Sequence, residues 1–169
     1  GGEVRYLWAL GALVNTEFTA LPDSAETPPA TSVGAPTPEP NRVEILAYCQ
    51  LKGVRPPRPK TTDEVYIEWS WFVARPEYMD EHLAHASYDV RLDGQPLANW
   101  ARFATEMKRE EGVWIIYWYY PVGKLSAGEH RVDFRLTWDA PITDGYKRFG
   151  PGTANEVDEG SCVFSVVEP

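Results

Sequence analysis

Two histidines three residues apart, His82 and His85, are the side chains in this sequence best suited to share a metal ion. They lie in the run DEHLAH at 80–85. Residues three apart lie on one face of a helical turn, and neutral imidazole is a common zinc ligand that Asp80 or Glu81 could supplement. Zinc usually takes four ligands, however, and the sequence contains neither a second cluster nor the His-Glu-x-x-His order of metalloproteases. We therefore expect a polar loop that contains two histidines, with no metal and no cofactor.

A third histidine, His130, lies in a turn before an apolar strand, where a lone imidazole could act as an acid–base group. No nucleophile motif accompanies it, because Ser126 is not in the G-x-S-x-G arrangement that exposes a catalytic serine. We expect His130 to form a hydrogen bond in its turn or to lie partly exposed, and we predict no enzyme activity. The alternative is a metal-binding or hydrolytic protein that uses His82, His85 and nearby carboxylates.

Acidic residues are concentrated in a late, loop-like segment, and hard oxygen ligands in a loop could hold calcium. These residues are Asp144, Glu156, Asp158 and Glu159. Their spacing fits no EF-hand loop, so we favour a solvated acidic loop. The adjacent carboxylates at 80–81 and 110–111 could serve a glycosidase only if two lay about 5–9 Å apart across a cleft. Sequence neighbours alone cannot establish such a pair.

The run VWIIYWYY at 113–120 is a strand that carries large side chains on both faces. A strand in two packed sheets normally buries only one face, so the other is either covered by another part of the chain or forms a binding patch. We expect cover by residues 6–14 or 97–107. If the patch is open, it could bind a protein or a glycan, since both stack on aromatic rings. The candidate contacts are then Trp114, Trp118 and Tyr120.

The composition restricts the class of partner. The chain has 169 residues, a net charge of -9 and a pI near 4.8. Nucleic-acid binding depends on cations that neutralise phosphates, so we expect no nucleic-acid partner and no attraction to anionic membranes. No apolar run reaches the roughly 18–20 residues that span a bilayer, so we predict no transmembrane segment. A lipid anchor upstream of this chain is compatible with that prediction.

The two cysteines, Cys49 and Cys162, lie near the start and the end of the strand-rich region. We predict a disulfide that joins the first and last strands; the alternative is two unrelated buried thiols. Because cytosolic thiols stay reduced, a disulfide places the protein in an extracytoplasmic setting, whether secreted, periplasmic or at the cell surface.

The chain divides into three pieces. Residues 1–21 form an apolar N-terminal segment that could be helix or strand. Residues 22–41, rich in Pro, Thr and Ala, form an extended linker like the stalks of exported bacterial lipoproteins. Residues 42–169 form the folded domain.

The folded domain reads as six or seven short strands separated by turn residues, which predicts an antiparallel β-sandwich with a barrel as the rival architecture. The strongest signal is the Asp93-Gly94 pair, which predicts a hairpin. Residues 97–110 suit either a short helix or an edge strand. The expected strands are 43–51, 65–73, 88–92, 113–120, 132–138 and 162–166.

The run LSAGEHRVDF at 125–134 resembles a turn-and-strand pattern of bacterial immunoglobulin-like and fibronectin-III-like surface modules, in which an aromatic strand leads into an L-x-x-G-x-H turn. Residues 118–120 supply the aromatic strand, and YDVRLDGQPL at 88–97 resembles the hairpin of such modules. These stretches cover under half of the chain, and the intersheet Cys-Trp-Cys arrangement of antibody domains is absent. The resemblance implies an immunoglobulin-like sandwich and an exported, non-catalytic module for protein or glycan contact. A purely structural, self-associating domain is the alternative.

Overall fold

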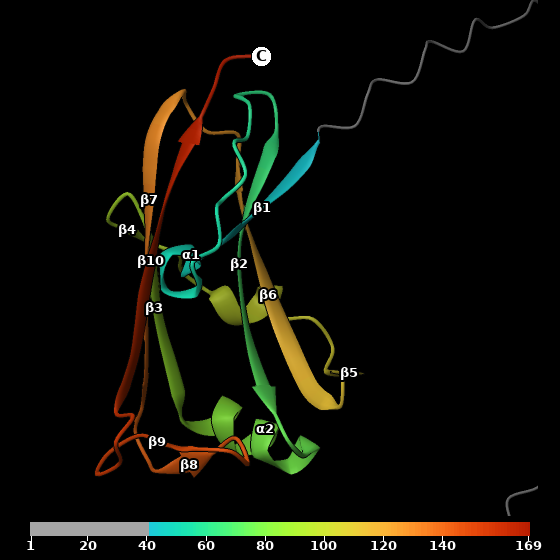
Figure 1. Ribbon diagram of the computed structural model, residues 1–169, viewed down its shortest axis with the longest axis vertical. Helices are drawn as coiled ribbons and strands as arrows, with labels where there is room; N and C mark the ends of the chain where they lie inside the picture. The colour runs from blue at the N-terminus through green and yellow to red at the C-terminus, as the bar shows by residue number, and fades with distance from the viewer. Residues whose placement is uncertain (1–40) are drawn as a thin grey trace, which may run out of the picture. The chain divides into compact units, whose positions relative to one another are not determined.

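The computed structural model describes residues 41–169, so the predicted apolar segment at 1–21 and almost all of the predicted linker at 22–41 lie outside the described residues. The described part is mostly β, with two four-stranded sheets and one two-stranded hairpin (Figure 1). Among the described residues, every strand pair is antiparallel except β1–β2, which is parallel.

Sheet I has the strand order β1-β2-β6-β5 and sheet II the order β10-β7-β3-β4. The strands of sheet I are β1 (Arg42–Leu46), β2 (Glu64–Val73), β6 (Val113–Gly123) and β5 (Lys108–Glu110). Those of sheet II are β10 (Val157–Val166), β7 (Gly128–Trp138), β3 (Ala86–Leu92) and β4 (Gln95–Pro96). The hairpin is β8 (Ile142–Thr143) with β9 (Arg148–Phe149), and the helices are α1 (Cys49–Lys52), α2 (Pro76–His85) and the 3-10 turn η1 (Trp100–Phe103).

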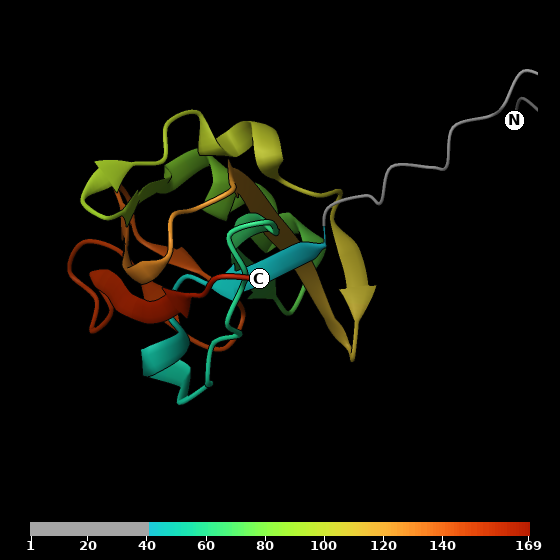
Figure 2. The ribbon, with the colours of Figure 1, turned by 90° about the horizontal axis from the view of Figure 1, so that it is seen from above.

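The core lies between the two sheets, because alternation along the long strands sends one set of side chains inward. Strand β2 buries its odd-numbered residues from Val65 to Val73, and β7 buries its even-numbered residues from His130 to Trp138. Across the interface, the ring centroids of Trp69 and Tyr88 lie 6.0 Å apart. The two sheets therefore pack face to face, and the view from above separates them as two layers (Figure 2).

Several predicted elements differ from the structure. Strand β7 begins at Gly128 rather than residue 132, and β10 begins at Val157 rather than residue 162, so part of the late acidic segment expected as a loop is strand. The first strand ends at Leu46 rather than continuing to residue 51, because the chain turns into α1. Residues 80–85, expected as a loop, belong to α2, which begins with Pro76 at a position where the missing amide of proline costs no helix bond. Strand β6 does not end at residue 120 but continues through Pro121 to Gly123, and its pairing with β2 shifts register between Val65 and Tyr66. The ambiguous stretch 97–110 contains both η1 and the edge strand β5.

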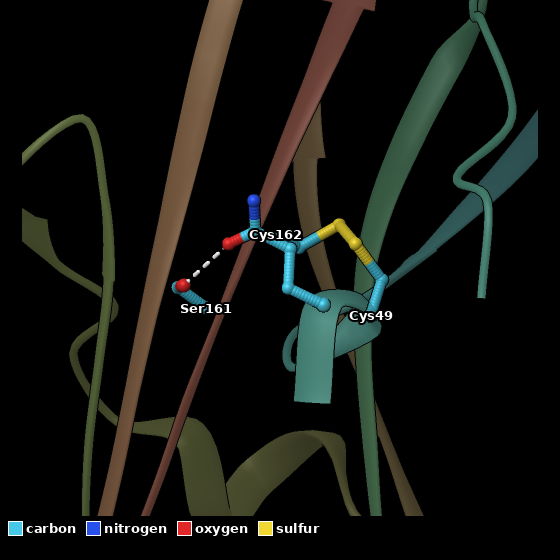
Figure 3. The surroundings of a disulfide bond; sticks show 4 residues. Cys49, Ser161 and Cys162 are labelled. Atoms are coloured by element: carbon cyan, nitrogen blue, oxygen red, sulfur yellow. Dashed lines mark hydrogen bonds between the residues drawn. A yellow bond between two sulfur atoms is a disulfide. The ribbon is translucent and has the colours of Figure 1, made fainter. Parts of the chain in front are cut away.

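The predicted disulfide is present, with Cys49 and Cys162 joined across 113 residues of sequence (Figure 3). It connects α1 to β10, however, rather than two strands, because Cys49 lies on the helical turn after β1. The hydroxyl of Ser161 donates a 2.7 Å hydrogen bond to Oε1 of Gln50 beside it. The two bonds hold α1 across the edge where β1 and β10 face each other.

Candidate functional site

A cavity of about 430 Å³ opens on one edge of the molecule, between the lower half of β2 and the start of β10. Helix α1 bounds it above and the β8–β9 hairpin bounds it below; these two elements lie midway along the sheets and at their lower end (Figure 1). We call it the groove. Its lining residues are Tyr48, Leu51, Lys52, Ser70, Trp71, Phe72, Phe134, Leu136, Asp144, Tyr146, Lys147, Phe149, Asn155, Val157 and Asp158. Its size and its mostly apolar lining match those of ligand sites in proteins.

Exposed apolar side chains converge on the groove. Six large apolar side chains of the described residues are exposed, and four of them, from four different segments, line it. The four are Leu51, Phe72, Tyr146 and Val157. A single exposed apolar side chain needs no explanation, but several around one concavity indicate a contact surface.

The upper wall depends on a close approach between the segment before α1 and strand β10. A Cβ on Gly160 would lie 2.5 Å from Cβ of Tyr48, so only glycine allows this contact. Tyr48 packs edge-on against Phe134, with ring centroids 4.9 Å apart. Its hydroxyl lies 3.4 Å from both the amide and the Oγ of Ser70, so it bridges α1 to β2. Burial raises the pKa of the Tyr48 phenol, which keeps it a neutral hydrogen-bonding group.

The lower wall is a tight turn between β8 and β9. One carboxylate oxygen of Asp144 accepts hydrogen bonds from the amides of Tyr146 and Lys147, at 2.7 and 2.6 Å. Gly145 has φ of +93°, and a Cβ there would lie 2.5 Å from Cβ of Ala74. This turn chemistry fixes the exposed ring of Tyr146 at the mouth of the groove.

The charged groups of the groove are arranged by depth. Asp158 points inward from β10, opposite Leu136. Burial raises the pKa of its carboxyl, while Lys52 and Lys147 oppose that rise. Both lysines are exposed at the rim, and neither forms an ion pair within the described residues. A bound group would therefore meet positive charge outside and a partly desolvated carboxyl inside.

The predicted aromatic contacts lie on the core side of β6. Trp118 is fully buried, and Trp114 and Tyr120 pack against the core cluster. The 3-10 turn η1 covers Trp118 and Tyr120, with ring centroids 6.2 Å apart for Trp100 and Trp118 and 4.7 Å apart for Phe103 and Tyr120. Trp114, Trp118 and Tyr120 therefore form no exposed patch, because twist and pairing direct this face toward sheet II.

The opposite face of β6 carries tyrosines whose ring faces are already occupied. The rings of Tyr117 and Tyr119 stack at 5.9 Å. The guanidinium of Arg42 lies over Tyr119 at 4.9 Å and over Tyr66 at 4.2 Å, and the ammonium of Lys108 lies over Tyr117 at 4.9 Å. These stacked rings and cations leave few free ring faces for a sugar to stack on.

The two histidines proposed for a metal point to different surroundings. His82 is fully buried and stacks on Trp71, with centroids 4.3 Å apart. Its Nδ1 accepts from Nε1 of Trp138 at 3.1 Å, so its Nε2 carries the proton and faces the hydroxyl of Tyr88 at 2.8 Å. Burial lowers the pKa of His82 to about 3. With both nitrogens engaged, His82 is a neutral core residue.

His85 points away from this cluster, with Nδ1 2.7 Å from the carboxylate of Asp139. No group of three or more histidines, cysteines or carboxylates that could hold a metal occurs in residues 41–169. The acidic residues of the late segment are also dispersed. Asp144 accepts hydrogen bonds within its own turn, Glu156 accepts a hydrogen bond from the amide of Gly152, and Glu159 forms an ion pair with Arg135. These carboxylates therefore do not form a calcium site together.

His130 makes the turn hydrogen bond that the sequence predicts, and a second one that it did not predict. Its Nδ1 lies 2.7 Å from Asp93, and its Nε2 lies 2.9 Å from the carbonyl of Ser126. Although burial lowers the pKa of His130, the Ser126 carbonyl and Asp93 outweigh it and raise the pKa overall. Asp93 also accepts the amide of Arg131 at 2.9 Å. The group fastens the β3–β4 hairpin to the turn before β7 and is structural.

The sequence pattern does not predict the groove. Its walls come from α1, β2, the β8–β9 turn and the start of β10, which are distant in sequence and carry no shared motif. The available signal was the Asp144-Gly145 turn, because Leu51 continues the alternation of the expected first strand in sequence although its side chain lies in the solvent.

Comparison with known proteins finds no relative: no model of a protein family, no curated protein and no solved structure matches the chain. Among the described residues, no helix has the length and apolar character needed to cross a membrane.

Proposed function

We propose that this chain is a non-catalytic recognition module of an extracytoplasmic protein, folded as an immunoglobulin-like β-sandwich, which binds a protein partner through the groove. The observation that carries this proposal is the convergence of Leu51, Phe72, Tyr146 and Val157 on one cavity. Protein interfaces place aromatic and aliphatic anchors in a desolvated centre with a charged rim, which is the arrangement of apolar walls and exposed lysines found here.

The disulfide between Cys49 and Cys162 supports the extracytoplasmic setting, since such bonds persist in oxidising compartments. A surface lipoprotein tethered through the Pro-rich segment at 22–41 is the form that best combines these features.

A protein partner is favoured over a glycan by the tyrosine face of sheet I. Glycan stacking requires exposed ring faces, and the rings of Tyr117 and Tyr119 are flanked by each other and by Lys108 and Arg42. The groove itself offers apolar surface that suits peptide side chains, with charged side chains at its rim.

The experiment uses 1-anilinonaphthalene-8-sulfonate (ANS), an apolar fluorescent anion, as the probe of the full chain. Phe72→Ser and Leu83→Ser form a matched pair, because both side chains are 46% exposed and only Phe72 lines the groove. We expect saturable ANS binding to the wild type, weakened about tenfold by Phe72→Ser and unchanged by Leu83→Ser. Equal effects of the two substitutions, or no ANS binding by the folded protein, would contradict the proposal.

A further inference from the structure

Strand β2 has a gap in its edge pairing at the mouth of the groove. On one side it pairs with β6 along almost its whole length, but on the other side β1 pairs with it only as far as Glu68. Beyond that point, the amide of Ser70 faces the Tyr48 hydroxyl at 3.4 Å, and the amide of Ala74 donates to the carbonyl of Asp144 at 2.7 Å.

The backbone groups of Phe72 point into this gap. Alternate residues of a strand direct their amide and carbonyl to the same edge, so Phe72 faces the same side as Ser70 and Ala74. The pairing on the β6 side agrees with this orientation. Tyr117 of β6 lies opposite Ser70, but its backbone bonds to Thr105 instead of to β2. Among residues 41–169, the Phe72 amide, the Phe72 carbonyl and the Ser70 carbonyl therefore face no paired strand, and no turn, loop or side-chain hydrogen bond reaches them.

We propose that the groove binds an extended peptide that adds a short strand beside Ser70–Phe72, places one apolar side chain between the sheets and carries acidic residues on either side of it. This inference rests on the proposed function and names the partner chemistry of the same site. An added strand satisfies the free edge of β2 by main-chain hydrogen bonds, a recurring mode of peptide recognition.

The side chains of an added strand would alternate between the cavity and the outside. A residue that points inward enters the space lined by Phe134, Leu136 and Phe149, which suits an aliphatic group. Its two neighbours point outward to the rim, where the exposed charges are Lys52 and Lys147. Because both lysines lack an ion pair in the described chain, acidic neighbours complement them.

The test uses the full chain and a synthetic peptide, acetyl-Ser-Thr-Asp-Leu-Asp-Thr-Ser-amide carrying a fluorophore, with binding followed by anisotropy. Single N-methyl groups are placed on the leucine amide or on either aspartate amide. Because only alternate amides of an added strand face β2, we expect methylation of one set to weaken binding about tenfold and methylation of the other set to leave it unchanged. If N-methylation of the aspartate amides weakens binding, the added strand is antiparallel to β2. If N-methylation of the leucine amide weakens binding, the added strand is parallel to β2.

Two further peptides test the side chains. Replacing leucine by serine should weaken binding about tenfold, and replacing both aspartates by lysine should weaken it several-fold at low salt, with a smaller difference at high salt. On the protein, hydrogen exchange of the Phe72 amide should be fast in the free chain and slow in the complex, while the Trp71 amide, which bonds to β6, is protected in both.

Three results would overturn the inference. They are a uniform response to N-methylation, a Phe72 amide whose exchange is unchanged by saturating peptide, and tighter binding of the lysine peptide than of the aspartate peptide. If ANS binds the groove as described above while the peptide fails these tests, strand addition is wrong and the proposed function stands. If ANS binding is also absent or insensitive to Phe72→Ser, the proposed function fails as well.

Discussion

Phe72 of β2 and Tyr146 of the β8–β9 turn face each other across the mouth of the groove, with ring centroids 6.5 Å apart. The two side chains are 46% and 62% exposed, although both are large and apolar. Neither is required to complete the core, since the buried cluster includes neither of them. Their exposure therefore supports the proposed contact with a partner.

Tyr146→Ser should separate binding from stability. We expect ANS affinity to fall about three- to tenfold, because one wall of the groove loses its ring, while the free energy of unfolding changes by less than about 0.5 kcal/mol, as for most exposed sites. Parallel ANS titrations and urea denaturation measure the two quantities. A large loss of stability with unaltered ANS affinity would assign Tyr146 to folding instead.

Adjacent residues of β6 should differ sharply in their effect on folding. Trp118→Ala removes a fully buried side chain and should cost about 3–5 kcal/mol of unfolding free energy. Tyr119→Ala removes only a half-buried ring and its contact with Arg42 and should cost about 1 kcal/mol. Urea midpoints of the two variants compare them directly, and similar costs would show that this strand is oriented differently.

His82 should make the protein sensitive to acid. Its pKa is lowered by burial to about 3 in the folded protein, whereas an unfolded histidine titrates near 6.5. Between pH 3 and pH 6.5 the unfolded state therefore binds more protons than the folded state. The stability that comes from keeping His82 neutral is complete above about pH 6.5, and it is lost as the pH falls toward 3, by up to about 1.4 kcal/mol per pH unit. His82→Gln does not titrate, so the difference in unfolding free energy between wild type and variant should shift in favour of the variant as the pH falls. A constant difference from pH 7 to pH 4 would refute this.

His130 should act in the opposite direction. Because the Ser126 carbonyl and Asp93 raise its pKa against the effect of burial, the folded state favours the imidazolium. The stabilisation is present below about pH 6.5 and is lost as the pH rises through the raised value. We expect His130→Gln to reduce the unfolding free energy by about 1 kcal/mol at pH 5.5 and by less at pH 8.5. Asp93→Asn removes the carboxylate and should reduce the pH dependence of the unfolding free energy over the same range. The double variant should lose less unfolding free energy than the sum of the two single variants.

The disulfide should provide a large share of the stability. In the chain-entropy model, a bond that closes a loop of this length contributes about 4–5 kcal/mol, and here it also holds α1 against β10. We expect the Cys49→Ser/Cys162→Ser variant, and the wild type under reducing conditions, to unfold at much lower urea concentrations. An unchanged midpoint after complete reduction would show that the bond contributes little.

The fold was predictable where one physical signal dominated. Strict alternation located β2 and β7, and Asp93-Gly94 located the β3–β4 hairpin, because these patterns act locally. The disulfide partners were also evident, since only two cysteines exist. The short elements escaped prediction: Cys49 continues the alternation of β1 in sequence but lies on a helical turn.

The candidate site was not predictable for a different reason. Alternation says which residues of β6 share a face, but only the pairing with β2 decides which face meets sheet II, so Trp114, Trp118 and Tyr120 looked as available as Tyr117 and Tyr119. The groove exists because β1 stops pairing at Glu68 and Gly160 lets Tyr48 approach β10, and both are properties of the folded chain.

The most direct test of the groove is a nuclear magnetic resonance titration of the full chain with ANS, which maps the amides whose shifts change on binding. We expect the largest changes at Leu51, Ser70–Phe72, Tyr146–Lys147 and Val157, which come from four segments that line the groove. Changes centred instead on Leu83 of α2, or on Tyr117 and Tyr119 of the outer face of sheet I, would show that the groove is not the binding surface.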